Sequence, residues 1–91
     1  MINSYKIDVD AVSEHIEYLK KFKKNLERQQ SDFNGDLKKA KTFWDDANYL
    51  LTLEANEKVN REQEKLIDSI NKSIKKLTVM RDEYLKYLRR R

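Results

Sequence analysis

Apolar residues recur at alternating intervals of three and four along two long stretches of this chain. In the first stretch they are Val12, Ile16, Leu19, Leu26, Phe33, Leu37 and Ala40. In the second they run from Tyr49 to Leu88 through Leu53, Ile67, Ile70, Ile74, Leu77 and Tyr84. This repeat places apolar side chains on one stripe of an α-helix and is typical of helices that pair along a narrow seam. The chain is therefore expected to contain two long helices.

The composition supports long, uninterrupted helices. Among 91 residues there is no proline and one glycine, and these are the residue types that most disfavour helix interiors. Charged residues make up 40% of the chain and apolar residues 38%. A core built from a stripe in so short a chain is thin, and such chains often need a partner to bury enough surface. The absence of cysteine excludes disulfides and thiolate chemistry.

The lone tryptophan marks the point at which the chain is expected to reverse. The bend motif consists of Phe43, Trp44, Asp45 and Asp46, between the two repeats. We expect an all-α, antiparallel two-helix hairpin that spans residues 1–91 as a single domain and dimerises into a four-helix bundle. Its helices are expected at about 9–42 and 47–89, with the bend at about 43–46.

Aspartates are expected to begin both helices. Asp8 is placed to cap the first helix, with Ile7 and Val12 as flanking apolar residues. Asp45 is expected to cap the second helix, which puts Trp44 and Tyr49 at the equivalent positions.

The pair Asn34-Gly35 is the one strong turn signal inside the first repeat. A break there would produce a three-helix bundle. However, the apolar spacing continues across Gly35 without a change of phase, which favours one helix.

Folding the hairpin about residue 46 aligns residues whose numbers add up to roughly 93. Gln30 then lies opposite Gln63, and Phe33 lies opposite Asn60. Buried amides are tolerated when they are hydrogen-bonded, so we expect a Gln30–Gln63 polar layer that fixes the register of the helices.

A second group of apolar residues lies outside the seam and is expected to bind a protein partner, because large exposed apolar groups commonly mark interfaces. The expected partner-binding residues are Tyr18, Phe22, Leu50, Leu51, Leu66, Val79, Met80, Leu85 and Tyr87.

The net charge of +4 is unevenly distributed along the sequence. Residues 1–46 carry nine basic and nine acidic groups, whereas residues 47–91 carry eleven and seven. Four of those eleven are Lys86, Arg89, Arg90 and Arg91, which can complement the helix dipole or contact polyanions. The run Lys20, Lys21, Lys23 and Lys24 is flanked by glutamates, which indicates a solvated helix face.

Catalytic and metal-binding signatures are missing from the sequence, so no cofactor, metal or small-molecule substrate is expected. His15 stands alone and is expected on the surface. Arg28, Lys39 and Arg61 are the residues that an all-helical, chorismate-mutase-like enzyme could use to bind an anion, but that family's motif is not matched around them. No signal peptide or membrane span is expected, and synthesis in the cytoplasm follows.

The size, the two long helices and the tryptophan at the bend resemble the WXG (ESAT-like) superfamily of type VII secretion in Gram-positive bacteria. The opening Ile7-Asp8-Val9-Asp10-Ala11-Val12 and the aromatic residue before Trp44 look like that pattern. The family's Trp-x-Gly is Trp44-Asp45-Asp46 here. Its C-terminal signal is an aromatic residue followed four residues later by an acid. In this chain Tyr84 is followed at that spacing by Leu88, and Tyr87 by Arg91.

These departures imply a divergent member that travels with a signal-bearing partner. The resemblance implies a non-enzymatic partner or targeting chaperone for a helical effector domain, such as that of an LXG-type toxin, or self-association as a homodimer. Export through a type VII system without a cleaved signal peptide would follow. The alternative is a nucleic-acid-associated regulatory protein that uses the basic C-terminus. Nucleic acid and stable membrane insertion are not expected under the first interpretation.

Overall fold

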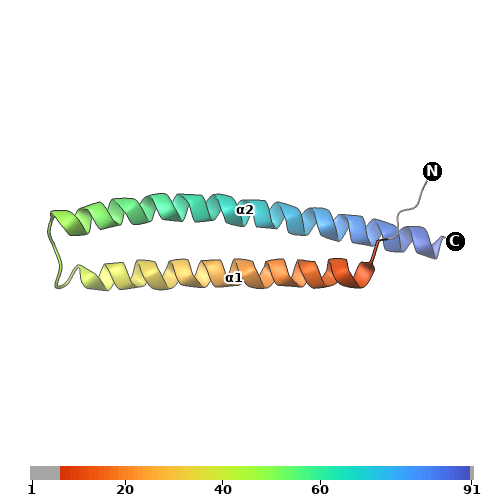
Figure 1. Ribbon diagram of the computed structural model, residues 1–91, viewed down its shortest axis with the longest axis horizontal. Coiled ribbons are helices and arrows are strands. Elements are labelled where there is room, and N and C mark those ends of the chain that lie inside the picture. Colours follow the sequence, from red (N-terminus) through yellow and green to blue (C-terminus); the bar gives the residue numbers. More distant parts are fainter. Residues whose placement is uncertain (1–6, 91) are drawn as a thin grey trace.

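The computed structural model describes residues 7–90, which form two long antiparallel helices joined by a short connection (Figure 1). Helix α1 spans Val9–Ala40 and α2 spans Ala47–Arg89. The expected all-α hairpin is confirmed, and the chain reverses at Trp44 as the lone tryptophan predicts. The described part of the chain does not include residues 1–6 or Arg91 of the basic C-terminus.

Each helix begins at an aspartate whose carboxylate binds a backbone N–H of the first turn. Asp8 accepts from the Ala11 N–H at 3.0 Å, which confirms the expected cap of α1. The cap of α2 is Asp46, which accepts from the Tyr49 N–H at 3.0 Å. The expectation of Asp45 was wrong by one residue. Each residue turns a helix by about 100°. The residue at which α2 begins therefore decides which way the Tyr49 side chain points.

The bend is held by contacts between the end of α1 and the start of α2. Tyr49 is only 2% exposed, and its hydroxyl donates to the Leu37 carbonyl at 2.7 Å. Leu37 belongs to the last turn of α1, where helix carbonyls lack partners along the helix. The Trp44 ring meets the Tyr49 ring edge to face, with ring centres 5.4 Å apart. Tyr49 therefore binds the end of one helix, lies in the first turn of the other and contacts the tryptophan ring.

Gly35 lies inside α1, which continues through it to Ala40. No glycine among the described residues has a positive φ, so nothing in the backbone requires glycine there. The three-helix alternative is therefore excluded.

The core is a narrow strip between the helices. The buried apolar residues are Ile16, Leu37, Tyr49 and Ile70. The expected seam of α2 is half-buried or buried along most of its length, but the seam of α1 departs from expectation at Phe33. Phe33 is 52% exposed, and Asn34 turns toward α2 in its place. Asn34 accepts hydrogen bonds from Asn56 and Asn60 of α2, which a phenylalanine at this position could not do.

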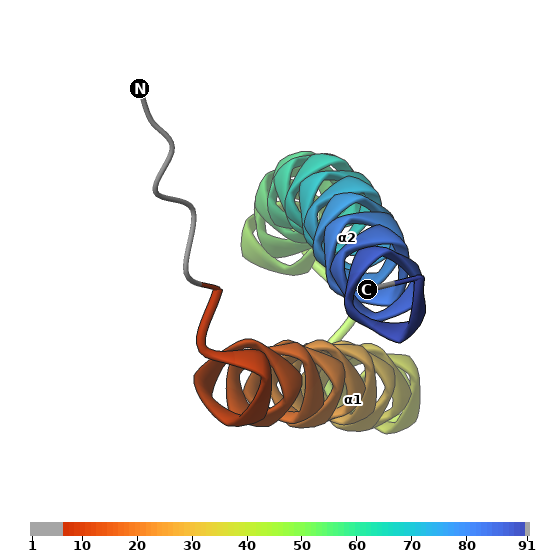
Figure 2. The ribbon, with the colours of Figure 1, turned by 90° about the vertical axis from the view of Figure 1, so that its right-hand side faces the viewer.

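The molecule is a rod 68 Å long. Its radius of gyration is 20.5 Å, whereas a compact protein of this length would have about 12 Å. The helices cross slightly when viewed from the end (Figure 2), and α2, with 43 residues against 32, extends beyond the start of α1. Within the described residues, neither helix has a stretch long and apolar enough to cross a membrane.

The continuous α1 helix makes Gly35→Ala an informative substitution. A Cβ at this position would meet no atom within 4 Å apart from its chain neighbours and the backbone of its own helix, so the substitution adds no clash. We expect the free energy of unfolding in urea to rise by about 0.5–1 kcal/mol, because alanine favours the helix and restricts the unfolded chain. A loss of stability would indicate a turn at Asn34-Gly35 and contradict this fold.

Candidate protein-interaction face

Eight of the nine residues expected to bind a partner are exposed, and Leu85 is half-buried. The structure does not gather them into one patch. Leu50 and Leu51 lie in the first turns of α2 beside the bend, whereas Tyr18 lies on α1 and stacks on Phe22 at 6.3 Å. Their exposure agrees with the sequence analysis, but only part of the set lies along a common line.

That line is an apolar track on α2. We define the apolar track as Val59, Leu66, Met80 and Tyr87, which occupy equivalent positions at spacings of seven or fourteen residues. Their exposed fractions lie between 40% and 60%. Residues spaced by seven lie on the same side of a helix that pairs with another in this way. Leu66, Met80 and Tyr87 were expected from the sequence, whereas Val59 was missed although its spacing from Leu66 could have revealed it.

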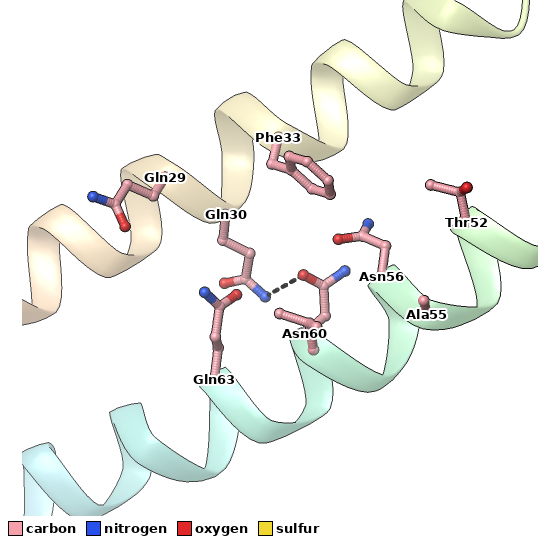
Figure 3. Close-up of a pocket in the computed structure, with 9 residues that line it drawn as sticks. Gln29, Gln30, Phe33, Thr52, Ala55, Asn56, Asn60 and Gln63 are labelled. Atoms are coloured by element: carbon pink, nitrogen blue, oxygen red, sulfur yellow. Dashed lines mark hydrogen bonds between the residues drawn. The ribbon is translucent and has the colours of Figure 1, made fainter. Parts of the chain in front are cut away.

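Near the bend, both helices contribute to a groove beside this track (Figure 3). The groove has a volume of about 430 Å³, and its apolar walls include Phe33 of α1 with Ala55 and Val59 of α2. A second groove continues from it through Val59 and Gln63 to Leu66. Phe33 therefore belongs to the exposed face and not to the seam. Like the cap of α2, it was misplaced by the sequence analysis.

Towards the other end of the rod, the track borders a larger groove of about 630 Å³. Its walls include Ile7, Met80, Tyr84 and Tyr87. Apolar walls thus accompany the track in both halves of the molecule. An elongated partner such as an amphipathic helix would match this shape, because its apolar side chains recur along one line.

Hydrogen-bonded amides join the two helices at the groove near the bend. We call Gln30, Asn34, Asn56 and Asn60 the amide cluster, and all of them except Asn34 line the groove. Gln30 Nε2 donates to Asn60 Oδ1 at 3.2 Å (Figure 3). Asn34 Oδ1 accepts from Asn56 Nδ2 at 2.7 Å and from Asn60 Nδ2 at 3.2 Å. These bonds tie α1 to α2 through polar groups only.

A polar layer was expected here, but with the wrong partner. Gln30 bonds to Asn60 and not to Gln63, whose side chain lies beside Gln30 in the same groove (Figure 3). Asn34 and Asn60, which bond at the same level, have residue numbers that add up to 94, close to the expected sum of roughly 93. Arg81 Nη1 donates to Ser13 Oγ at 3.2 Å, so the expected register is nearly met farther from the bend.

The residues named for the enzyme alternative lie at exposed positions on both helices. Arg28, Lys39 and Arg61 are all exposed, and Arg28 donates to Asn25 on its own helix. Lys39 lies eleven residues, or about 16 Å, along α1 from Arg28. His15 is exposed and stacks on Tyr18 at 6.1 Å. Within residues 7–90, no group of three or more His, Cys, Asp or Glu residues is placed to hold a metal ion.

The amide cluster can be tested by Asn34→Leu. This substitution removes the acceptor for two amide donors, and we expect the free energy of unfolding to fall by about 1–3 kcal/mol. Gln63→Leu in the same groove is the matched control and is expected to change stability by less than about 0.5 kcal/mol. Equal effects in urea denaturation would show that the bonds to Asn34 do not set the stability of this region.

The chain matches no protein-family model, no curated protein and no solved structure. Its resemblance to WXG proteins therefore rests on the residues of its own sequence.

Proposed function

We propose that this chain is a non-enzymatic interaction protein that binds an amphipathic helix of a protein partner through the apolar track. The observation that carries the proposal is the exposure of Val59, Leu66, Met80 and Tyr87 on one side of α2. Full burial of such a side chain stabilises a protein or complex by about 1.5–3 kcal/mol. A partner helix would supply the burial that α1 does not provide.

The shape of the face favours a helical partner over a flat one. The track runs parallel to a rod, and grooves lie beside it in both halves of the molecule. A helix laid along the track would place its own apolar residues at intervals of three and four against these grooves. The product would be a bundle of three or four helices, according to whether the partner supplies one helix or two.

The most specific setting that we propose for this interaction is type VII secretion. This setting is supported by the hairpin with Trp44 at its bend and by the sequence resemblance given above. In that setting the chain is a co-secreted partner or a targeting chaperone for a helical effector domain, as in LXG-type toxins. Helix packing alone accounts for the activity, and no bond is made or broken.

A matched pair of substitutions tests whether the track binds the partner. Leu66 lies on the track, whereas Leu51 is a 62% exposed leucine of the same helix that lies off it. The tagged chain is expressed in the organism that encodes it, cross-linked and purified, and the recovered proteins are identified by mass spectrometry. We expect a WXG-like protein or an LXG-type helical domain.

Once this partner is purified, we expect Leu66→Glu to raise the Kd at least about tenfold, because it places a charge in an apolar contact. Leu51→Glu is expected to leave the Kd within about twofold. Recovery of no protein of these classes would contradict the setting in type VII secretion. Equal losses from both substitutions would contradict the role of the track.

A further inference from the structure

The apolar track on α2 is interrupted at its middle. Its residues are spaced by seven except for Leu66 and Met80, which are fourteen residues apart. Ser73 lies halfway between them and is exposed. Residues spaced by seven lie on the same side of a helix that pairs with another in this way. A partner helix that covers the track from Val59 to Tyr87 must therefore also cover Ser73.

The surface around Ser73 carries positive charge. A groove of about 520 Å³ at this level is lined by Lys72, Ser73, Lys75, Lys76 and Val79. The charged residues in its walls are thus all lysines. Lys76 and Val79 also line the groove that contains Met80 and Tyr87, so the lysines adjoin the apolar track.

Two other grooves beside the track have walls of both charges. The groove that reaches Leu66 is lined by Lys58 and Glu62. The groove at the open end is lined by Lys76 and Glu83. A partner with no charge of its own could cover either groove more easily than the groove at Ser73, where no carboxylate of α2 lines the wall.

The lysines around Ser73 also lack a counter-charge along the helix. From residue 69 to residue 81, α2 has four basic residues and no acidic one. One of the four, Arg81, pairs with Asp82 at 3.2 Å. Among the residues that the structure describes, the other three form no ion pair. A partner helix would remove water from these lysines, which is unfavourable unless the partner supplies the opposite charge.

A second copy of this chain would not supply that charge. Two copies that cover each other's tracks place Ser73 opposite Ser73, whether the paired helices run parallel or antiparallel, because Ser73 is the midpoint of the track. Lys72 and Lys76 lie within about one turn of Ser73. Each copy would bring them towards the same lysines of the other copy, and like charges repel most where water is excluded.

We infer that the helix covering the apolar track belongs to a different protein and carries an Asp or Glu residue opposite Ser73. This inference rests on the proposed function and specifies the chemistry of its partner. The carboxylate pairs with Lys72 and Lys76, and apolar residues on either side of it cover Leu66 and Met80. Ion pairs at such a position also fix the register of the partner helix along α2, as polar positions do in coiled coils.

The test uses the full chain and a labelled synthetic helical peptide of about 30 residues, which spans the roughly 42 Å of the track. The peptide has leucines at alternating intervals of three and four. Three versions of it carry Glu, Gln or Lys at the middle of the leucine stripe. Fluorescence anisotropy measures the Kd of each version.

Two variants of the chain are compared with the unsubstituted chain. Lys72→Glu/Lys76→Glu reverses the charge beside Ser73. The control, Lys20→Glu/Lys24→Glu, reverses two exposed lysines at the same spacing on α1. Circular dichroism confirms that each variant is helical.

We expect the Glu peptide to bind the unsubstituted chain about threefold to tenfold more tightly than the Gln peptide, and the Lys peptide to bind more weakly than both. Lys72→Glu/Lys76→Glu is expected to reverse this order, because the variant presents carboxylates to the peptide. Lys20→Glu/Lys24→Glu is expected to keep the order. In sedimentation equilibrium, Leu66→Glu is expected to leave the mass of the chain unchanged, because no second copy covers the track.

Four results would overturn the inference. Equal Kd values for the three peptides, with binding lost in Leu66→Glu, would retain the track as the binding site but remove the acidic residue. Reversal of the order in the control variant would show attraction to net charge alone. A dimer that Leu66→Glu separates would make a second copy the occupant. Binding of none of the three peptides would contradict the role of the track itself, and the inference with it.

Discussion

The limit on apolar burial in a two-helix rod governs the rest of this structure. Each helix covers only one stripe of the other, so the buried apolar residues are Ile16, Leu37, Tyr49 and Ile70. Each fully buried side chain of this kind stabilises by about 1.5–3 kcal/mol, whereas ordering the chain costs about 1–2 kcal/mol for each residue. The exposed apolar track is thus a source of stability that becomes available only when another helix covers it.

The contacts that do join the helices fix their alignment more than they add burial. Tyr49 ties the start of α2 to the end of α1. The amide cluster joins the two helices farther from the bend. Amide bonds require one particular offset of the helices, whereas apolar contacts would allow the helices to slide. This fixed offset keeps Phe33 beside Val59.

The two helices, the bend and the seam of α2 could be predicted from the sequence because the spacing of apolar residues continues over many turns. Phe33 could not be placed correctly, because a repeat of three and four assigns the seam to the larger apolar residue, and the amides of α2 instead select Asn34. Asp45 and Asp46 are equally good caps in isolation, and the contact of Tyr49 with Leu37 distinguishes them only in the folded chain.

We propose that a partner covers the apolar track in the cell. The chain contains no cysteine, so single cysteines can report exposure without interference. The direct measurement compares the rate of thiol labelling of Leu66→Cys and Leu51→Cys, first in the purified chain and then in cells of the organism that encodes it. We expect rapid labelling of both cysteines in the purified chain, and protection of position 66 but not of position 51 in cells. Equal labelling of the two positions in cells would show that no partner covers the track.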